Sequence, residues 1–271
     1  MASIGSVAEV GPVDRLIGSP TETSRGAFRI QGVRPKAFPT YPTLWNHDAK
    51  RERRFIVAPD SEGLPLPKAD VARIWATATR AHYNRDLQFN SQSLIVAMTE
   101  GQCIGGRAWP SVIFENSEHE YVFTLWCNST LGLLMHWWAS NKTQSGRGTT
   151  SVTGIPNIPM LDTRALIAEQ HAAARTAFEA MRERLFLPFD QIDEDPARAE
   201  LDRRLLVDVL GLPESLCGLD GPLALLRRKL AREPQIHGGK RTRVVFYETV
   251  DESGATIVRE RTERRLDRGE G

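Results

Sequence analysis

YVFTLWCNSTLGLLMHWWA, from Tyr121 to Ala139, is a mostly apolar stretch that decides between a membrane span and a buried helix. Its length is close to the roughly 20 residues that cross a bilayer. Asn128, Ser129 and His136 interrupt it, however, and each polar side chain would be costly in the middle of a bilayer. Its large apolar side chains recur every three or four positions, the spacing of an α-helix. We therefore expect one helix over 121–139 that is buried on most sides, and no membrane partner.

The overall composition indicates a globular protein with balanced charge. The sequence has 271 residues, of which 41% are hydrophobic and 25% are charged, and its formal net charge is +1. These values fit one large domain or two small ones, exclude wholesale disorder and favour no partner by bulk charge. Cys103, Cys127 and Cys217 lie far apart without a CxxC pair, so neither a disulfide framework nor a zinc ribbon is expected. The first residues lack an export signal, and we expect a cytoplasmic location.

Residues 1–160 are predicted to form a small mixed β-sheet with packed helices. Prolines punctuate the first third, which favours short strands and loops. A helix is expected from Asp70, a typical N-cap residue, to about His82. The predicted strands, each short and rich in β-branched or apolar residues, are Ala27–Ile30, Arg54–Ala58, Leu94–Thr99, Ser111–Phe114 and Thr149–Thr153.

The remaining residues change in character. Three predicted helices run from Asp162 or Thr163 to about Leu185, from Pro196 to about Gly211 and from Pro222 to about Ala231. Alternation over 241–259 around an Asp-Glu-Ser-Gly turn predicts a β-hairpin, followed by a frayed charged tail. The expected fold class is α/β (α+β). Its expected units are a recognition-like domain over 1–160, a helical spacer or docking segment over 161–233, and the hairpin and tail over 234–271.

Charge is concentrated in residues 25–54. This segment holds eight basic residues against the acids Asp48 and Glu52, a local excess of six. Such a patch can neutralise phosphates, although, taken alone, it is better explained as a solvated loop surface. The eight basic residues are Arg25, Arg29, Arg34, Lys36, Lys50, Arg51, Arg53 and Arg54.

Motifs for catalysis or cofactor binding are absent from the sequence. It contains no GxGxxG after a strand, no Walker loop, no HExxH or CxxC zinc motif and no GxSxG elbow. Its six histidines show no ligand or catalytic spacing. The acids at 190–195 (Asp190, Asp193, Glu194, Asp195) suggest either metal ligands or the favourable placement of acids before the helix that starts at Pro196. We favour the helix start, and we expect no cofactor in this chain.

Two polar loops suit nucleic acid better than catalysis. The loop over 82–92 mixes amides with an arginine, and such side chains can contact adenine and guanine edges; a hydrogen-bonded turn is the alternative. The loop over 141–150 has two glycines and several donors for phosphate oxygens; a solvated linker is the alternative. Trp45 and Trp109 lie near basic residues, where core packing is favoured over stacking on a base. The candidate DNA contacts are Lys50, Arg51, Arg53, Arg54, Asn84, Arg85, Gln88, Asn90, Gln92, Arg107, Lys142, Arg147 and Thr149.

Three segments resemble one known family in their order along the chain. Ser3–Pro12 has the sequence SIGSVAEVGP, Tyr121–Gly132 has YVFTLWCNSTLG and Gly146–Asp162 has GRGTTSVTGIPNIPMLD. They are similar to the start, a central helix and the exit strand of the target-recognition domains in type I restriction–modification specificity subunits. DEDPARAELDRRLLVDVLGLP, from Asp193 to Pro213, resembles a helix near the C-terminus of adenine-N6 DNA methyltransferases that carry a fused recognition domain.

This resemblance implies a division of labour. In the family, a catalytic domain binds S-adenosylmethionine and carries an [ND]PP[YF] motif, and the recognition domain selects the DNA sequence. The chain has no such motif; its nearest piece, Ile155–Pro159, lacks adjacent prolines and the aromatic residue. The resemblance therefore implies a non-catalytic recognition part that binds double-stranded DNA, while a methyltransferase partner binds S-adenosylmethionine. It also implies that Asn128 and Ser129 pack helices, and that Leu161–Leu185 docks a partner.

Three hypotheses follow from the sequence. The first is a sequence-specific DNA-recognition module of a restriction–modification or anti-phage methylation system. The second is a metal-dependent nuclease or hydrolase that uses the carboxylates at 190–195. The third is a protein-interaction module whose polar loops bind no DNA.

Overall fold

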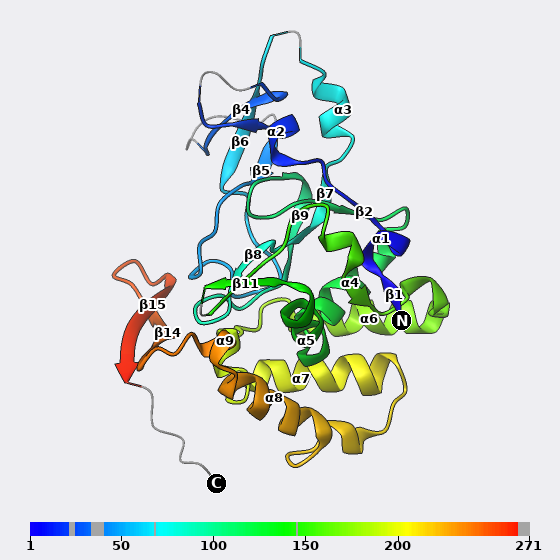
Figure 1. The fold of residues 1–271 in the computed structure, drawn as a ribbon, viewed down its shortest axis with the longest axis vertical. Helices are drawn as coiled ribbons and strands as arrows, with labels where there is room; N and C mark the ends of the chain where they lie inside the picture. Colours follow the sequence, from blue (N-terminus) through cyan, green and yellow to red (C-terminus); the bar gives the residue numbers. More distant parts are fainter. Residues whose placement is uncertain (22–24, 34–40, 68, 145, 265–271) are drawn as a thin grey trace.

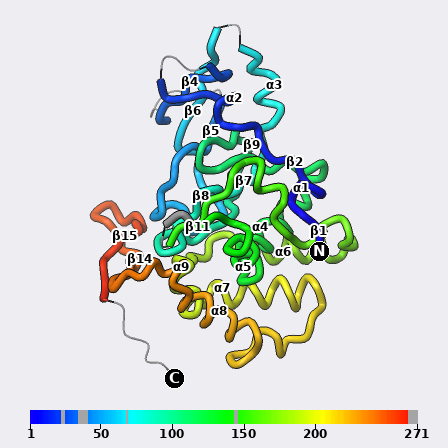
Figure 2. Tube along the Cα trace, in the orientation of Figure 1, coloured from blue at the N-terminus to red at the C-terminus, as the bar shows by residue number. Residues whose placement is uncertain are grey.

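The computed structural model describes residues 1–21, 25–33, 41–67, 69–144 and 146–264. Helices and strands are interspersed along the chain, which confirms the predicted α/β (α+β) class. A lobe of strands lies at one end of the molecule, long helices lie at the other, and a two-stranded ribbon projects from the side (Figure 1). Figure 2 shows the same path as a tube, with the first residues beside the middle of the chain.

The main sheet is mixed, as the sequence predicts. Its six strands have the order β3-β4-β6-β5-β9-β7, in which β3 and β4 are parallel, β5 and β9 are parallel, and the other neighbours are antiparallel. The strand bounds are β3 Gly18–Ser19, β4 Phe28–Gly32, β5 Pro42–Leu44, β6 Ser61–Pro65, β7 Thr79–Tyr83 and β9 Val96–Gly105.

Smaller sheets fix the loops and the N-terminal residues. Strand β8 (Asp86–Gln88) pairs with β12 (Arg147–Thr149), and β12 pairs with β11 (Asn141–Gln144). Two further pairs join β1 to β13 and β2 to β10, which places the first ten residues against residues from the middle of the chain. Their bounds are β1 Ala2–Ser3, β2 Glu9–Val10, β10 Val112–Ile113 and β13 Pro159–Met160, and the short helices nearby are α1 Ile4–Val7 and α2 Asp14–Ile17.

The predicted helix over 121–139 is in fact two helices, α4 (Glu118–Asn128) and α5 (Thr130–Ala139). Ser129 between them is extended, with ψ 168°, and its hydroxyl accepts a hydrogen bond from the Gly132 amide at 3.1 Å, which caps α5. A continuous helix was wrong because Ser129 prefers this capping position. Within the described residues, no helix is long and apolar enough to cross a membrane.

The helical segment follows its predicted pattern with one shortened element. Helix α7 (Pro196–Arg203) continues into a π-helical turn at Arg204–Val209, and α8 spans Pro222–Arg232, so both predicted helices are confirmed. The helix expected from 162 or 163 to 185 is shorter: α6 spans Ala168–Met181. Asp162 instead caps a 3-10 turn at Thr163–Ala165. The short helix α9 spans Pro234–His237.

The C-terminal hairpin is confirmed as β14 (Thr242–Val250) and β15 (Thr256–Arg264), antiparallel and in continuous register. Other predicted elements were wrong in extent. The segment 54–58 makes only an isolated bridge from Ile56 to Met98, and residues after Thr149 turn away. The helix from Asp70 ends with α3 (Val71–Trp75), because Thr79–Tyr83 pairs with β9 as β7.

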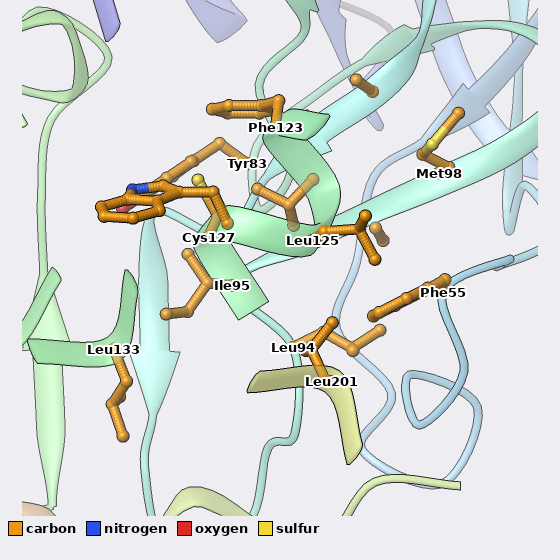
Figure 3. Packing of buried hydrophobic residues seen from close by; sticks show 14 of the residues in the cluster. Phe55, Tyr83, Leu94, Ile95, Met98, Phe123, Leu125, Cys127, Leu133 and Leu201 are labelled. Atoms are coloured by element: carbon orange, nitrogen blue, oxygen red, sulfur yellow. The ribbon is translucent and has the colours of Figure 1, made fainter. Parts of the chain in front are cut away.

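One large hydrophobic cluster joins the N-terminal part to the helices (Figure 3). Phe55 stacks on Phe178 of α6 and on Phe186, with ring centroids 5.5 Å and 5.0 Å apart. Leu201 of α7 belongs to the same cluster as Leu94 and Leu125 (Figure 3). A second cluster around Phe28 and Trp45 fills the lobe of β3, β4 and α3. The division at 160 and 233 stays a prediction, although the larger cluster contains residues from all three proposed units.

A buried histidine makes the stability of this core depend on pH. His136 is 0% exposed and its Nδ1 lies 2.7 Å from the Tyr83 hydroxyl. Burial lowers the pKa of His136 to about 4. In the unfolded chain the pKa is about 6.5, so the unfolded state binds a proton first as the pH falls.

We predict that the free energy of unfolding falls as the pH drops from 7 to 5. The buried His136 should account for roughly 2 kcal/mol of this loss, because its folded pKa is depressed and only the unfolded state is protonated in this window. Urea unfolding of the wild type and His136→Gln at both pH values measures it. An identical loss in the variant would contradict the assignment to His136.

Candidate nucleic-acid interface

The buried carboxylate of Glu52 anchors the turn over residues 46–52. Its Oε1 accepts hydrogen bonds from the Asp48 amide at 2.6 Å and from Trp109 Nε1 at 3.2 Å, and its Oε2 lies 3.3 Å from His47 Nδ1. Glu52 is 1% exposed. The sequence suggests only that Glu52 reduces the net positive charge of residues 25–54. In the structure it fixes the exposed residues Lys50 and its neighbours onto Trp109.

Trp109 belongs to a segment that lies against the predicted loop over 82–92. The Arg85 amide donates to the Ala108 carbonyl at 3.2 Å, and the Ala108 amide donates to the Trp45 carbonyl at 3.1 Å. Arg107 is therefore exposed between the Trp45 and Arg85 segments. Both tryptophans are buried, Trp45 at 4% and Trp109 at 0% exposed, so they pack in the core.

The loop over 141–150 is joined to the loop over 82–92 by strand pairing. Arg147 lies opposite Gln88, and Thr149 lies opposite Asp86. The Thr150 amide donates to the Arg85 carbonyl at 2.8 Å. Gly148 makes this approach possible, because a Cβ there would lie 2.7 Å from the Phe89 ring. The turn over 46–52 and the two predicted loops, over 82–92 and 141–150, are thus neighbours in space; we refer to them as the three loops. We call the exposed and half-buried candidate residues of these loops, together with the adjacent Arg107, the loop face: Lys50, Arg51, Arg85, Gln88, Arg107, Lys142, Arg147 and Thr149.

Three side chains of the loop over 82–92 that were predicted to contact DNA are buried instead. Asn84, Asn90 and Gln92 are 0%, 8% and 4% exposed. The Asn84 side-chain amide donates to Gln92 Oε1 at 3.3 Å and to the Leu94 carbonyl at 3.2 Å. The same Gln92 oxygen accepts from the Gln88 amide at 2.6 Å. These amides hold the loop in shape, so the loop face does not include them.

Arg53 and Arg54 also serve internal contacts. Arg53 is 2% exposed and donates two hydrogen bonds, from Nε and Nη2, to the Phe186 carbonyl at 3.1 Å each. Its guanidinium lies 4.5 Å from the Phe246 ring, and burial lowers the pKa of Arg53 to about 10. Arg54 donates to Glu248 of the hairpin at 2.6 Å. Neither guanidinium belongs to the loop face.

The basic segment 25–54 does not form one patch. Arg29 lies on β4 and Arg25 just before it, and β6 separates β4 from β5 in the sheet. Arg34 and Lys36 lie outside the described residues. The cations that the structure brings together come instead from four separate parts of the chain.

Ion pairs neutralise some cations of the loop face and leave others available. Arg147 holds Asp86 with both ends of its guanidinium fork, Nε at 2.7 Å. Burial raises the pKa of Asp86, but the hydrogen bond and charge of Arg147 lower it more, and the net shift is downward. Lys50 pairs with Glu260 at 3.5 Å, and Arg85 with Asp14 at 3.9 Å.

Arg51, Arg107 and Lys142 form no ion pair with any residue that the structure describes. Lys142 instead donates to the Trp138 carbonyl at 3.2 Å, and its ammonium lies 5.0 Å from the centre of the Trp137 ring. Burial lowers the pKa of Lys142, and the charge of Glu233 opposes this shift. An exposed ion pair such as that between Lys50 and Glu260 contributes only about 0 to 1 kcal/mol.

Comparison with known proteins gives one informative likeness. Part of a type IIG restriction endonuclease, BpuSI, has a similar fold. The two structures align with a TM-score of 0.60 and 12% sequence identity, over 88% of this chain and 32% of that chain. The chain therefore spans about a third of that enzyme's length, and the likeness concerns the fold alone. No protein-family model and no curated protein matches the sequence.

The acidic cluster at 190–195 is built into the start of α7. Asp195 caps this helix by accepting from the Ala197 and Arg198 amides at 3.0 Å and 3.3 Å, and it also accepts from the Leu187 amide at 3.0 Å. Glu194 pairs with Arg243 at 2.6 Å. The preferred helix-start interpretation is confirmed for Asp195. Among the described residues, no three His, Cys, Asp or Glu side chains are grouped to hold a metal ion.

Sequence reasoning missed two features of this region. Glu52 could have been singled out as an isolated acid within a basic run, but nothing local shows that its partner is Trp109. Trp138 is 73% exposed near the end of α5, and its carbonyl accepts a hydrogen bond from Lys142, four residues later. The sequence does not indicate this exposure, because the apolar pattern of 121–139 does not show which side chains of the helix remain exposed to solvent.

We predict that Arg53→Glu unfolds or strongly destabilises the protein. The change places an unpaired negative charge in the interior and removes both hydrogen bonds to Phe186, which should cost about 3 kcal/mol or more. The matched variant Arg54→Ala, at a more exposed position, should cost about 1 kcal/mol or less. Thermal unfolding followed by circular dichroism measures both. Equal melting temperatures for the two variants would contradict the interior role of Arg53.

Proposed function

We propose that this chain is a DNA sequence-recognition module of a restriction–modification or DNA-methylation system. The observation that carries the proposal is the meeting of three loops, separate in sequence, in one cationic and amide-bearing face around Glu52 and Trp109. The likeness of the fold to part of a type IIG restriction endonuclease supports the same context. So does the resemblance of its sequence segments to target-recognition domains.

On this proposal, the loop face divides phosphate binding from base recognition. Arg51, Arg107 and Lys142 lack ion-pair partners among the described residues, and they suit phosphate oxygens, which set affinity. Gln88 and Arg147 lie opposite each other on β8 and β12, and they suit base edges: glutamine for adenine and arginine for guanine. Asp86 holds the guanidinium of Arg147 in a fixed plane before DNA arrives.

The same proposal assigns methyl transfer to another chain or domain. The sequence lacks an [ND]PP[YF] motif, and no dinucleotide or phosphate loop replaces it. S-adenosylmethionine would therefore be bound by a methyltransferase partner. This chain would recognise the DNA sequence without catalysing a reaction. The α6 region and the helices after it are the parts that we propose contact such a partner.

A protein-interaction module is the second candidate, favoured by exposed leucines. Leu212, Leu219 and Leu225 are 41%, 91% and 48% exposed around α8. Replacing all three by Ser should abolish capture of a co-expressed methyltransferase without changing DNA affinity, if both functions coexist. A chain that captures a protein partner but binds no DNA would support this second candidate alone. The nuclease hypothesis has no supporting observation in the described residues.

The loop face should bind duplex DNA with a strong dependence on salt. We predict that the double variant Arg107→Glu and Lys142→Glu binds a pooled 30-base-pair duplex at least tenfold more weakly and loses about two units of the log–log salt slope. Fluorescence anisotropy over a series of salt concentrations measures both quantities. The matched control reverses Arg73 on α3 and Lys229 on α8, both exposed and outside the loop face, and should leave affinity unchanged. Equal affinities for the two double variants would refute the proposed face.

Gln88 should contribute to sequence discrimination. We predict that Gln88→Ala reduces the preference for one base pair by about 1 to 3 kcal/mol, because a bidentate amide contact to adenine would be lost. Its affinity for non-cognate DNA should stay the same. Selection of bound duplexes from a randomised pool, followed by sequencing, compares the wild type with the variant. An unchanged selected sequence would exclude Gln88 from base recognition.

A further inference from the structure

The β14–β15 hairpin projects from the body beside the loop face (Figure 1). Each strand has nine residues, and the register is continuous from Thr242–Arg264 to Val250–Thr256. At about 3.4 Å per residue, the ribbon is roughly 30 Å long. Within the described residues it pairs with no other strand. We propose that this ribbon is an arm that contacts the DNA phosphate backbone next to the loop face; the inference rests on the proposed function.

One face of the ribbon is committed to the body of the protein. Phe246 lies opposite Glu260, is 6% exposed and lies beneath the Arg53 guanidinium. Glu260 pairs with Lys50 at 3.5 Å, and Glu248 on the same face pairs with Arg54 at 2.6 Å. Two acids of the ribbon are thus neutralised by cations of the turn over 46–54. The ribbon is held against the segment that begins the loop face.

The other face carries exposed guanidinium groups. Side chains alternate between the two faces of a strand, so Arg259 and Arg261 face away from Glu260 and Phe246. Arg259 lies opposite Tyr247, and the Arg261 guanidinium lies 5.7 Å from the centre of the Tyr247 ring. The Arg261 side chain is 64% exposed, and its carboxylate partner Glu263 is shared with Arg243. The acids Glu248, Glu260 and Glu263 are thus held in ion pairs, while the side chains of Arg259 and Arg261 are exposed.

The segment that leads into the ribbon is hydrogen-bonded to the loop over 141–150. The Gly146 amide donates to the Gln235 carbonyl at 3.0 Å, so Gly146, next to β12, lies against α9, just before β14. The tip is less suited to DNA, because Asp251 caps the turn and Glu252 is exposed there. The contact surface is therefore the half of the ribbon that holds Arg259 and Arg261. Guanidinium groups there fit phosphates, a contact that positions the protein without selecting a base.

The test compares Arg259→Ala/Arg261→Ala with the wild type and with Arg203→Ala/Arg228→Ala. The control pair lies on α7 and α8, and each of its arginines has one carboxylate partner, as Arg261 does. Circular dichroism melts establish that both double variants fold. Anisotropy on a 30-base-pair duplex and on an unrelated duplex, at several salt concentrations, gives affinity and salt slope.

We expect the ribbon variant to bind both duplexes about five- to tenfold more weakly, with a salt slope smaller by about two, and the control to match the wild type. An unchanged affinity and slope, while the Arg107/Lys142 variant is impaired, would overturn the ribbon contact and leave the proposed function standing. Tighter binding by the ribbon variant would overturn it as well, since the arm would then exclude DNA. A changed sedimentation coefficient with unchanged DNA binding would assign the ribbon to contacts between copies. A wild type that binds no duplex at all would overturn both proposals.

Discussion

The buried guanidinium of Arg198 is the interaction on which the rest of the structure depends. Arg198 is 0% exposed and donates to the Ser93 carbonyl at 2.7 Å and to the Asn128 carbonyl. It lies 4.6 Å from the ring centres of both Phe186 and Phe189, and its Nε is 3.7 Å from Asp195. Burial lowers the pKa of Arg198 to about 10, so it remains charged at neutral pH. One side chain of α7 thereby joins the end of α4, the entry to β9 and the segment before α7.

The segment before α7 is also hydrogen-bonded to residues next to the loop face. The Phe186 amide donates to the Arg53 carbonyl at 2.9 Å, and Arg53 returns two hydrogen bonds to the Phe186 carbonyl. The Phe189 amide donates to the Gln92 carbonyl at 3.2 Å. The turn over 46–54 and the loop over 82–92 are therefore both hydrogen-bonded to the stretch that packs on Arg198. Arg198 thereby supports two of the three loops from below, although its side chain is fully buried.

The sequence predicts local elements better than the residues of the candidate interface. Pro196 and Pro222 mark real helix starts, and the alternation around Ser253 and Gly254 marks a real hairpin, because caps, prolines and turns act within a few residues. The break at Ser129 was missed because a single serine cap is a weak signal, and the large apolar side chains on both sides of it continue the helical spacing. Arg53 was misassigned to the surface because its partner Phe186 lies far away in sequence. Asn84 and Gln92 were misassigned because the sequence does not show that their amides bond to each other and to the backbone of their own loop.

The arginines fall into two groups that sequence alone cannot separate. Arg53 and Arg198 lie under aromatic rings and donate to backbone carbonyls, so removing either one leaves acceptors and rings without a partner inside the protein. Arg107 and Arg259 lie at the surface, where a charge costs little to keep and can be exchanged for a phosphate contact. With a net charge of only +1, the protein cannot attract DNA by its total charge. On the proposed function, surface cations such as those of the second group supply the phosphate contacts, and the first group holds in place the segments that carry them.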